Sequence, residues 1–195
     1  MSPSTLAPRA IVSAGALIIP VAAEIIWPKF GDSGHLVFAT SQLVGWVLLA
    51  SVIVDVQRLF PALSAVRSGR VGHRLLLIGC GLQVLFALGY GATAAISGEP
   101  NEASFVLFLA GFLAQLVGGI AWWRAMRNAP NLRAVRIWVL ATAVLGFLAM
   151  AVGDDPWHDI FLLSSYAAWA ATGISVARSS TSQHDATNSL TESTP

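Results

Sequence analysis

The amino-acid sequence predicts an all-α bundle of six transmembrane helices, and three observations lead to this fold class. First, 55% of the 195 residues are hydrophobic and only 11% are charged. A soluble globular protein carries about 25% charged residues, so this chain cannot build a water-exposed shell. Second, six apolar stretches come close to the roughly 20 residues that a helix needs to cross a bilayer. Third, these stretches are continuously apolar, whereas the strands of membrane barrels alternate with a period of two.

The six predicted spans form one transmembrane domain, residues 1–177. We place them at about 10–27, 34–55, 75–97, 103–123, 136–153 and 159–177. Most of the connections combine Pro or Gly with Asn or Asp, which is the usual chemistry of turns. The sequence therefore leaves no room for a separate soluble domain.

Two segments outside the spans have their own predictions. Residues 57–73 are expected to form a short amphipathic loop, with Phe60, Leu63 and Val66 on the membrane surface. Residues 178–195 are rich in Ser and Thr, with a single large apolar residue, so a disordered tail is expected there.

The first span has an alternative interpretation as a cleavable signal peptide. Arg9 precedes an apolar stretch, and the small residues Ala22 and Ala23 lie where a peptidase would cut. The apolar stretch is long, however, and the residues before Glu24 read Val-Ala-Ala instead of Ala-x-Ala. We therefore expect this segment to be retained as a membrane helix.

The distribution of arginine predicts the orientation of the spans. Cytoplasmic loops of membrane proteins accumulate Lys and Arg. If the N-terminus lies inside, ten of the eleven basic residues fall on the inner side: Arg9, Arg58, Arg67, Arg70, Arg74, Arg124, Arg127, Arg133, Arg136 and Arg178. Both termini are therefore predicted to be cytoplasmic. The excess of Arg over Lys is typical of a GC-rich genome and favours a bacterial inner membrane as the location.

Two amides and two indoles are predicted to share one depth in the membrane. Gln83, Gln115, Trp46 and Trp169 each lie nine residues from the charged residue at the inner end of their span. At 1.5 Å per residue, this is roughly 13–14 Å from the inner boundary. We interpret the four side chains as a polar layer that packs helices together.

Glycines near the two glutamines predict a close helix pair. Small residues allow membrane helices to approach one another, and the spacing includes Gly79 and Gly91 around Gln83, and Gly111 and Gly119 around Gln115. We expect an antiparallel hairpin with a Gln83–Gln115 hydrogen bond and these four glycines on or beside the interface. A polar constriction in a solute path is the alternative.

A second polar layer is predicted in the outer half of the membrane. Polar groups at membrane depth are costly and often functional, and Glu24 is the only acid well inside an apolar stretch. An outward-open polar pocket would gather Glu24, Gln42, Tyr90, His158, Asp159 and Ser165. Such groups suit a cation, a proton or a polar headgroup. The alternative is a Glu24 that faces water between helix ends.

The sequence predicts no catalytic residue, no metal site and no cofactor. Gly31-Asp32-Ser33-Gly34 looks like a serine-protease sequence, but it fits a loop that caps the second span. His35, His158 and Asp159 are secondary candidates for a divalent cation, although their spacing matches no recognised zinc pattern. Cys80 has no partner cysteine and is expected to be a small buried residue.

Three function classes remain open. The preferred one is a non-enzymatic membrane component, an accessory or partner protein, whose contacts are the lipid bilayer and another membrane protein or a second copy of the chain. The first alternative is a small-solute or ion pathway through the outer polar pocket. The second is a membrane enzyme or redox subunit with an outer-face His and carboxylate site. Nucleic acid is excluded as a partner by the net charge of +1 and the lack of a basic cluster on a polar face.

Overall fold

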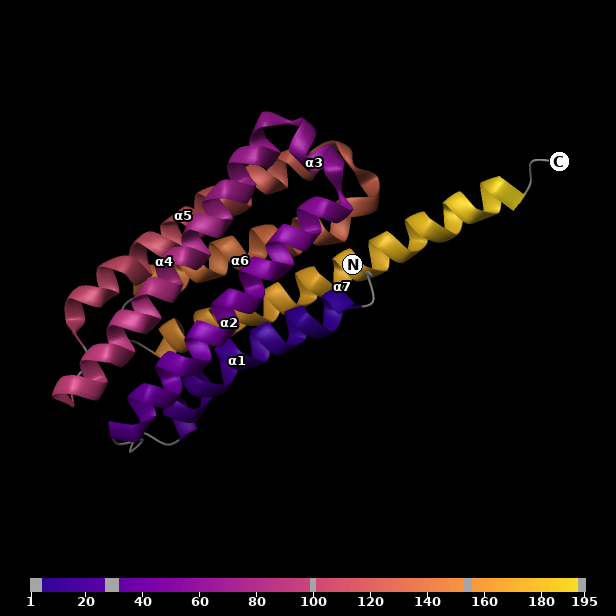
Figure 1. Ribbon diagram of the computed structural model, residues 1–195. Helices are drawn as coiled ribbons and strands as arrows, with labels where there is room; N and C mark the ends of the chain where they lie inside the picture. Colours follow the sequence, from indigo (N-terminus) through magenta and orange to yellow (C-terminus); the bar gives the residue numbers. More distant parts are fainter. Residues whose placement is uncertain (1–4, 27–31, 99–100, 153–155, 193–195) are drawn as a thin grey trace.

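The structure, a computed structural model, describes residues 5–26, 32–98, 101–152 and 156–192 (Figure 1). Within these ranges, the side chains at 24–26, 32–33, 102, 130, 156 and 181–192 are not described. The described secondary structure is helical: α1 (Leu6–Ile26), α2 (Asp32–Leu59), α3 (Pro61–Ala65), α4 (Arg67–Ser97), α5 (Phe105–Ala125), α6 (Arg133–Val152) and α7 (Pro156–Glu192), with short 3₁₀ turns η2 (Glu102–Ser104), η3 (Met126–Asn128) and η4 (Pro130–Leu132).

Six of the described helices are long and apolar enough to cross a membrane: α1, α2, α4, α5, α6 and α7. Each of them overlaps one of the six stretches predicted from the sequence. The all-helical fold class and the number of candidate spans are therefore confirmed for the described part of the chain. These six helices indicate an integral membrane protein.

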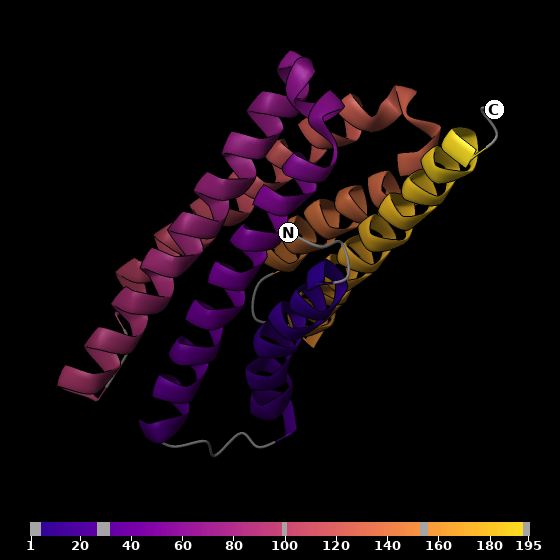
Figure 2. The same ribbon diagram turned by 45° about the vertical axis from the view of Figure 1, so that its right-hand side comes forward.

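The long helices form a closed ring in which each packs against its neighbours along the chain. α1 packs on α2, α2 on α4, α4 on α5, α5 on α6 and α6 on α7, and α7 returns to pack on α1. Figure 2 shows α1 lying between α2 and α7, with α4 on the far side of α2. The closing contact is very close, because a Cβ atom on Gly173 would lie 2.1 Å from the Cβ atom of Ala10.

The ring has two ends, and the arginines gather at one of them. α1, α4 and α6 begin there, while α2 and α5 end there. Two contacts between neighbouring elements lie at this end. Arg9 of α1 meets Asp55 of α2, and the Ser179 hydroxyl of α7 donates to the Asn131 carbonyl oxygen of η4 at 3.0 Å. We call this the arginine end.

The connection between α2 and α4 differs from the loop predicted at 57–73. α2 continues to Leu59, the short α3 follows, and α4 begins at Arg67. Pro61 explains where α2 ends, because proline lacks an N–H and disfavours helical geometry at the residue before it. Phe60 has φ −124° and ψ 74°, outside the helical region.

The predicted surface position of the apolar residues in this connection is wrong for two of the three. Phe60 and Leu63 are only 5% and 2% exposed, whereas Val66 is 42% exposed. α3 folds back on the first turn of α4, where a Cβ atom on Gly69 would lie 1.8 Å from the Leu63 carbonyl oxygen. The absence of a side chain at Gly69 thus lets Leu63 pack inside the bundle.

α7 continues well past the predicted end of the sixth span. Its backbone is helical to Glu192, and its last part extends beyond the other helices (Figure 1). The sequence predicts disorder over 178–195, whereas the described backbone of that segment, which ends at Glu192, is helical. No proline or glycine interrupts residues 174–192, which leaves the helix free to propagate.

Candidate functional site

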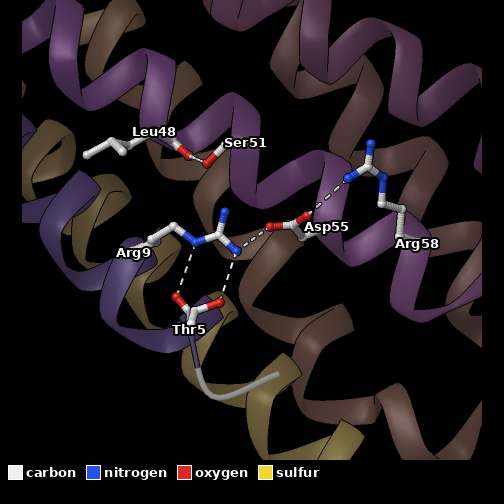
Figure 3. A network of polar contacts seen from close by, with 6 residues as sticks. All are labelled: Thr5, Arg9, Leu48, Ser51, Asp55 and Arg58. Carbon is white, nitrogen blue, oxygen red and sulfur yellow. Dashed lines mark hydrogen bonds and ion pairs between the residues drawn. The ribbon is translucent and has the colours of Figure 1, made fainter. Parts of the chain in front are cut away.

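An ion pair joins α1 to α2 at the arginine end (Figure 3). The Arg9 guanidinium contacts the Asp55 carboxylate through Nη2 and Oδ2. Arg9 also donates from Nε to the Thr5 carbonyl oxygen at 3.2 Å. On the other side of Asp55, the Arg58 guanidinium lies 3.8 Å from Oδ1.

The acid of this pair is buried and the two arginines are not equivalent. The Asp55 side chain is 9% exposed, against 24% for Arg9 and 71% for Arg58. A buried charge is tolerated when a charged partner and hydrogen bonds compensate its lost hydration. Arg9 supplies this compensation for Asp55, whereas Arg58 extends largely into solvent.

Sequence reasoning missed this pair. Asp55 served only to mark the inner end of the second span, and Arg9 only as an orientation signal. A usable signal was present, because Asp55 is the single acid among the predicted inner segments before the C-terminal tail. An acid alone among many arginines, at the end of an apolar helix, favours an ion pair over a solvated carboxylate.

A buried aromatic cluster joins α2, α5 and α7 inside the ring. Trp46 of α2 meets Phe112 of α5 and Tyr166 of α7 edge to face, with ring centroids 6.0 and 5.8 Å apart. Trp46 and Tyr166 are 0% exposed and Phe112 is 2% exposed. Since α2, α5 and α7 are not neighbours along the chain, these three rings meet across the middle of the bundle. We call them the central aromatic cluster.

Gln42 is tied to this cluster. The Trp46 indole donates from Nε1 to Gln42 Oε1 at 2.9 Å, and the Gln42 amide donates to the Leu17 carbonyl oxygen at 3.5 Å. Gln42 is 0% exposed. It therefore connects α1, α2 and the central cluster.

Gln83 and Gln115 lie in the contact between α4 and α5. A Cβ atom on Gly79 would lie 2.6 Å from Gln115 Cγ, and one on Gly111 would lie 2.8 Å from Gln83 Nε2. Each amide thus lies over a glycine of the opposite helix. The amides do not bond each other as expected, because Gln83 Nε2 donates to the Phe108 carbonyl oxygen at 3.0 Å.

The contact residues of this hairpin alternate at intervals of four and three, not at a constant four. α4 contributes Gly72, Leu76, Gly79 and Gln83, and α5 contributes Gly111, Gln115, Gly118 and Trp122. This is the spacing of a left-handed helix pair. The predictions for two glycines are accordingly wrong: Gly91 contacts Ala39 of α2, and Gly119 contacts Ala143 of α6.

Four polar atoms in the middle of the bundle have no hydrogen-bond partner among the described residues. Three are Gln83 Oε1, Gln115 Nε2 and Trp169 Nε1, and the fourth is the Tyr166 hydroxyl of the central aromatic cluster. All four side chains are buried, with 0%, 3%, 3% and 0% exposure. Unsatisfied polar groups at such depth are energetically costly.

The members of the predicted outer pocket bond to several different partners. The Tyr90 hydroxyl pairs with His35 Nδ1 at 2.8 Å, and His158 Nδ1 lies 2.7 Å from the Ala149 carbonyl oxygen. The Ser165 hydroxyl donates to the Thr142 carbonyl oxygen at 3.0 Å. Asp159 is half-buried at the start of α7, and the side chain of Glu24 lies outside the described residues. The convergence of these groups with Glu24 stays a prediction.

A divalent-cation site at His35, His158 and Asp159, the secondary candidate from the sequence, also stays a prediction. Over the residues whose side chains are described, no three His, Cys, Asp or Glu side chains lie close enough to hold a metal ion. Cys80 is buried, without a disulfide partner.

Comparison of the chain with known protein families, with curated proteins and with solved structures finds no match. The identification therefore rests on the architecture. A ring of six apolar helices indicates an integral membrane protein.

Proposed function

We propose that this protein is a non-enzymatic component of the membrane that acts through contacts between its helices and other membrane proteins. The central aromatic cluster carries this proposal. Trp46, Phe112 and Tyr166 occupy the axis along which a solute would have to pass. With the axis filled, the outer surface of the ring is what remains for interaction.

The charged and hydrogen-bonding groups support the same conclusion. Asp55 is bound by Arg9, and Gln42 is bound by Trp46. His158 and Ser165 are engaged with backbone carbonyls of α6. Groups used in this way hold helices together and are poorly placed to react with a substrate.

Photo-crosslinking in native membranes tests the partner role. A photoreactive residue replaces one lipid-facing side chain at a time: Val47, Ile78, Val117 or Val144, which are 53%, 53%, 53% and 40% exposed. We expect one face of the ring to yield a discrete protein adduct, with lipid adducts alone on the others. A differently tagged second copy identifies a homo-oligomer. Lipid adducts at every position would refute the proposal.

A solute or ion pathway is the second candidate, and the three unpaired atoms of Gln83, Gln115 and Trp169 favour it. They would have to join the outer polar pocket around Glu24 and Gln42, with the aromatic cluster moving aside. In proteoliposomes loaded with a pH- or ion-sensitive dye, a pathway predicts flux that Gln115→Leu reduces and Phe112→Ala increases. If the wild type, Gln115→Leu and Phe112→Ala all gave the same flux as protein-free vesicles, a solute or ion pathway would be excluded.

We place the arginine end in the cytoplasm of a bacterial cell. Cysteines at Ser68 and Asn131 should resist an impermeant thiol reagent in intact cells, while one at Asn101 should react. Cys80 adds little background because it is 1% exposed. Labelling in the reverse pattern would overturn this orientation.

A further inference from the structure

The arginine end carries a strong excess of positive charge. Its ten arginines come from the starts of α1, α4 and α6, the ends of α2 and α5, and the middle of α7. Among the described side chains, Asp55 is the only acid at this end, and Arg9 already binds it. Since Arg58 also lies beside Asp55, ten arginines at this end face one described acid, and positive charge is in clear excess.

The arginines divide into those that serve the fold and those that do not. Arg70 donates to the Ser64 carbonyl oxygen at 2.9 Å, and Arg136 donates to the Arg127 carbonyl oxygen at 3.3 Å while lying over the Trp123 ring. By contrast, five exposed guanidinium groups make no hydrogen bond or ion pair with any described residue: Arg67, Arg74, Arg124, Arg127 and Arg133. We call these five the arginine surface.

Four of the five arginines have an exposed apolar side chain one helical turn further from the arginine end. These pairs, four residues apart, are Arg67 with Val71, Arg74 with Ile78, Arg124 with Ile120, and Arg133 with Ile137. The apolar members are 42%, 53%, 38% and 52% exposed. Residues four apart lie on one face of a helix, so each guanidinium lies directly above an apolar surface.

Tryptophans mark the depth of two of these pairs, Arg124 with Ile120 and Arg133 with Ile137. Trp123 precedes Arg124, and Trp138, which is 41% exposed, follows Ile137. Tryptophan concentrates at the boundary between hydrocarbon and headgroups. Arg124 and Arg133 therefore lie at the level of lipid phosphates. Arg67 precedes Arg74 by seven residues in α4, about 10 Å along the helix, and so lies further out from the membrane.

We propose that the arginine surface binds anionic phospholipids. A guanidinium binds a phosphate in a bidentate manner, and the apolar residue below it fits the acyl chain of the same molecule. An arginine followed by an apolar side chain thus matches the order of phosphate headgroup and acyl chain in a phospholipid. An acidic soluble protein would need a water-facing surface without the apolar flank.

Native mass spectrometry of the full-length protein tests the proposal. The protein is released from nanodiscs of equal phosphatidylglycerol and phosphatidylcholine content, and the retained lipids are counted. We expect phosphatidylglycerol to be enriched and the enrichment to fall as salt is raised before release. Arg124→Gln with Arg133→Gln should reduce it by about fivefold for each arginine, the factor that one basic residue contributes at an anionic surface.

The matched control replaces the same two arginines by lysine. Arg124→Lys with Arg133→Lys keeps the charge and should retain most of the enrichment, and circular dichroism checks that both double variants remain helical. Equal retention of the two lipids, or glutamine variants that behave like the wild type, would overturn the proposal. So would an acidic protein that remains bound in place of phosphatidylglycerol and is released by salt.

Discussion

The α1–α2 and α4–α5 pairs are both antiparallel, yet they are held together by different physical means. α1 and α2 are joined by the Arg9–Asp55 ion pair and by the Ser13 hydroxyl, which donates to the Gly45 carbonyl oxygen at 2.8 Å. α4 and α5 are joined by close packing, with glycines of one helix facing large side chains of the other, and by hydrogen bonds from Gln83 to the Phe108 carbonyl oxygen at 3.0 Å and from Trp122 to the Gly69 carbonyl oxygen at 3.1 Å. Among the described residues, an ion pair joins α1 to α2, whereas α4 and α5 rely on close packing and on hydrogen bonds between uncharged groups.

The difference reflects where each contact lies. A charge costs less free energy near the end of the bundle, because Arg9 remains 24% exposed to solvent there. At mid-depth no water compensates a charge, so close packing of small residues is the available means. Removal of one partner should accordingly cost more at the ion pair than at any single position of the α4–α5 contact.

The largest effect is expected from Arg9→Leu. Loss of Arg9 leaves the buried Asp55 carboxylate with only the largely exposed Arg58 beside it, which should lower the free energy of unfolding by about 3 kcal/mol. Unfolding by sodium dodecyl sulfate in mixed micelles, followed by near-UV circular dichroism, measures this. The double variant Arg9→Leu with Asp55→Leu contains no buried charge and should recover most of the loss. A double variant as unstable as Arg9→Leu would contradict a role of charge.

Gly118→Ala should come next. Its new Cβ atom would lie 2.9 Å from the Leu76 backbone nitrogen and 3.1 Å from the Gly72 carbonyl oxygen. Forcing the helices apart should cost about 2 kcal/mol in the same unfolding assay. Gly81→Ala is the matched control, since nothing lies within 4 Å of its Cβ position. This control should stabilise the helix by about 0.5–1 kcal/mol, and equal losses in both variants would refute the role of close packing.

Gln83→Leu should have a smaller effect. It removes the hydrogen bond to the Phe108 carbonyl oxygen but keeps most of the side-chain volume over Gly111. Polar contacts between membrane helices contribute about 0.6–2 kcal/mol, so we expect a loss of about 1 kcal/mol with the fold intact. A loss as large as that of Arg9→Leu would show that polar contacts, and not shape, dominate the α4–α5 pair.

Arg58→Gln should have the smallest effect. The Arg58 guanidinium is 3.8 Å from Asp55 and its side chain is 71% exposed. Exposed ion pairs contribute little, so the change in unfolding free energy should stay below about 0.5 kcal/mol. A loss comparable to that of Arg9→Leu would mean that the two arginines share Asp55 equally.

The spans could be predicted because hydropathy and charge vary strongly along the chain. The partners of interior side chains could not, because the depth of a residue says nothing about its direction around the helix axis. Gln83 and Gln115 were expected to bond each other, but Gln83 lies opposite Gly111 and donates to the Phe108 carbonyl oxygen, while Gln115 lies opposite Gly79. Gly91 and Gly119 face other helices for the same reason.

The Arg9–Asp55 pair shows a second limit. Its members lie in separate helices, and neither position belongs to a motif. Local spacing therefore gave no warning of their contact. What the sequence does contain is an imbalance, one acid among the inner arginines, and only the packing of α1 on α2 turns this imbalance into a pair.

The closed ring also bears on how the protein is made. Five of its six helix contacts join neighbours along the chain, so each can form as soon as the next helix leaves the ribosome. The contact between α1 and α7 is different, because the first helix must wait until almost the whole chain has been synthesised. Until then, the face of α1 that carries Leu6 and Ala10 has no protein partner from α7. A chain truncated before α7 could therefore form the other five contacts but could not close the ring between α1 and α7.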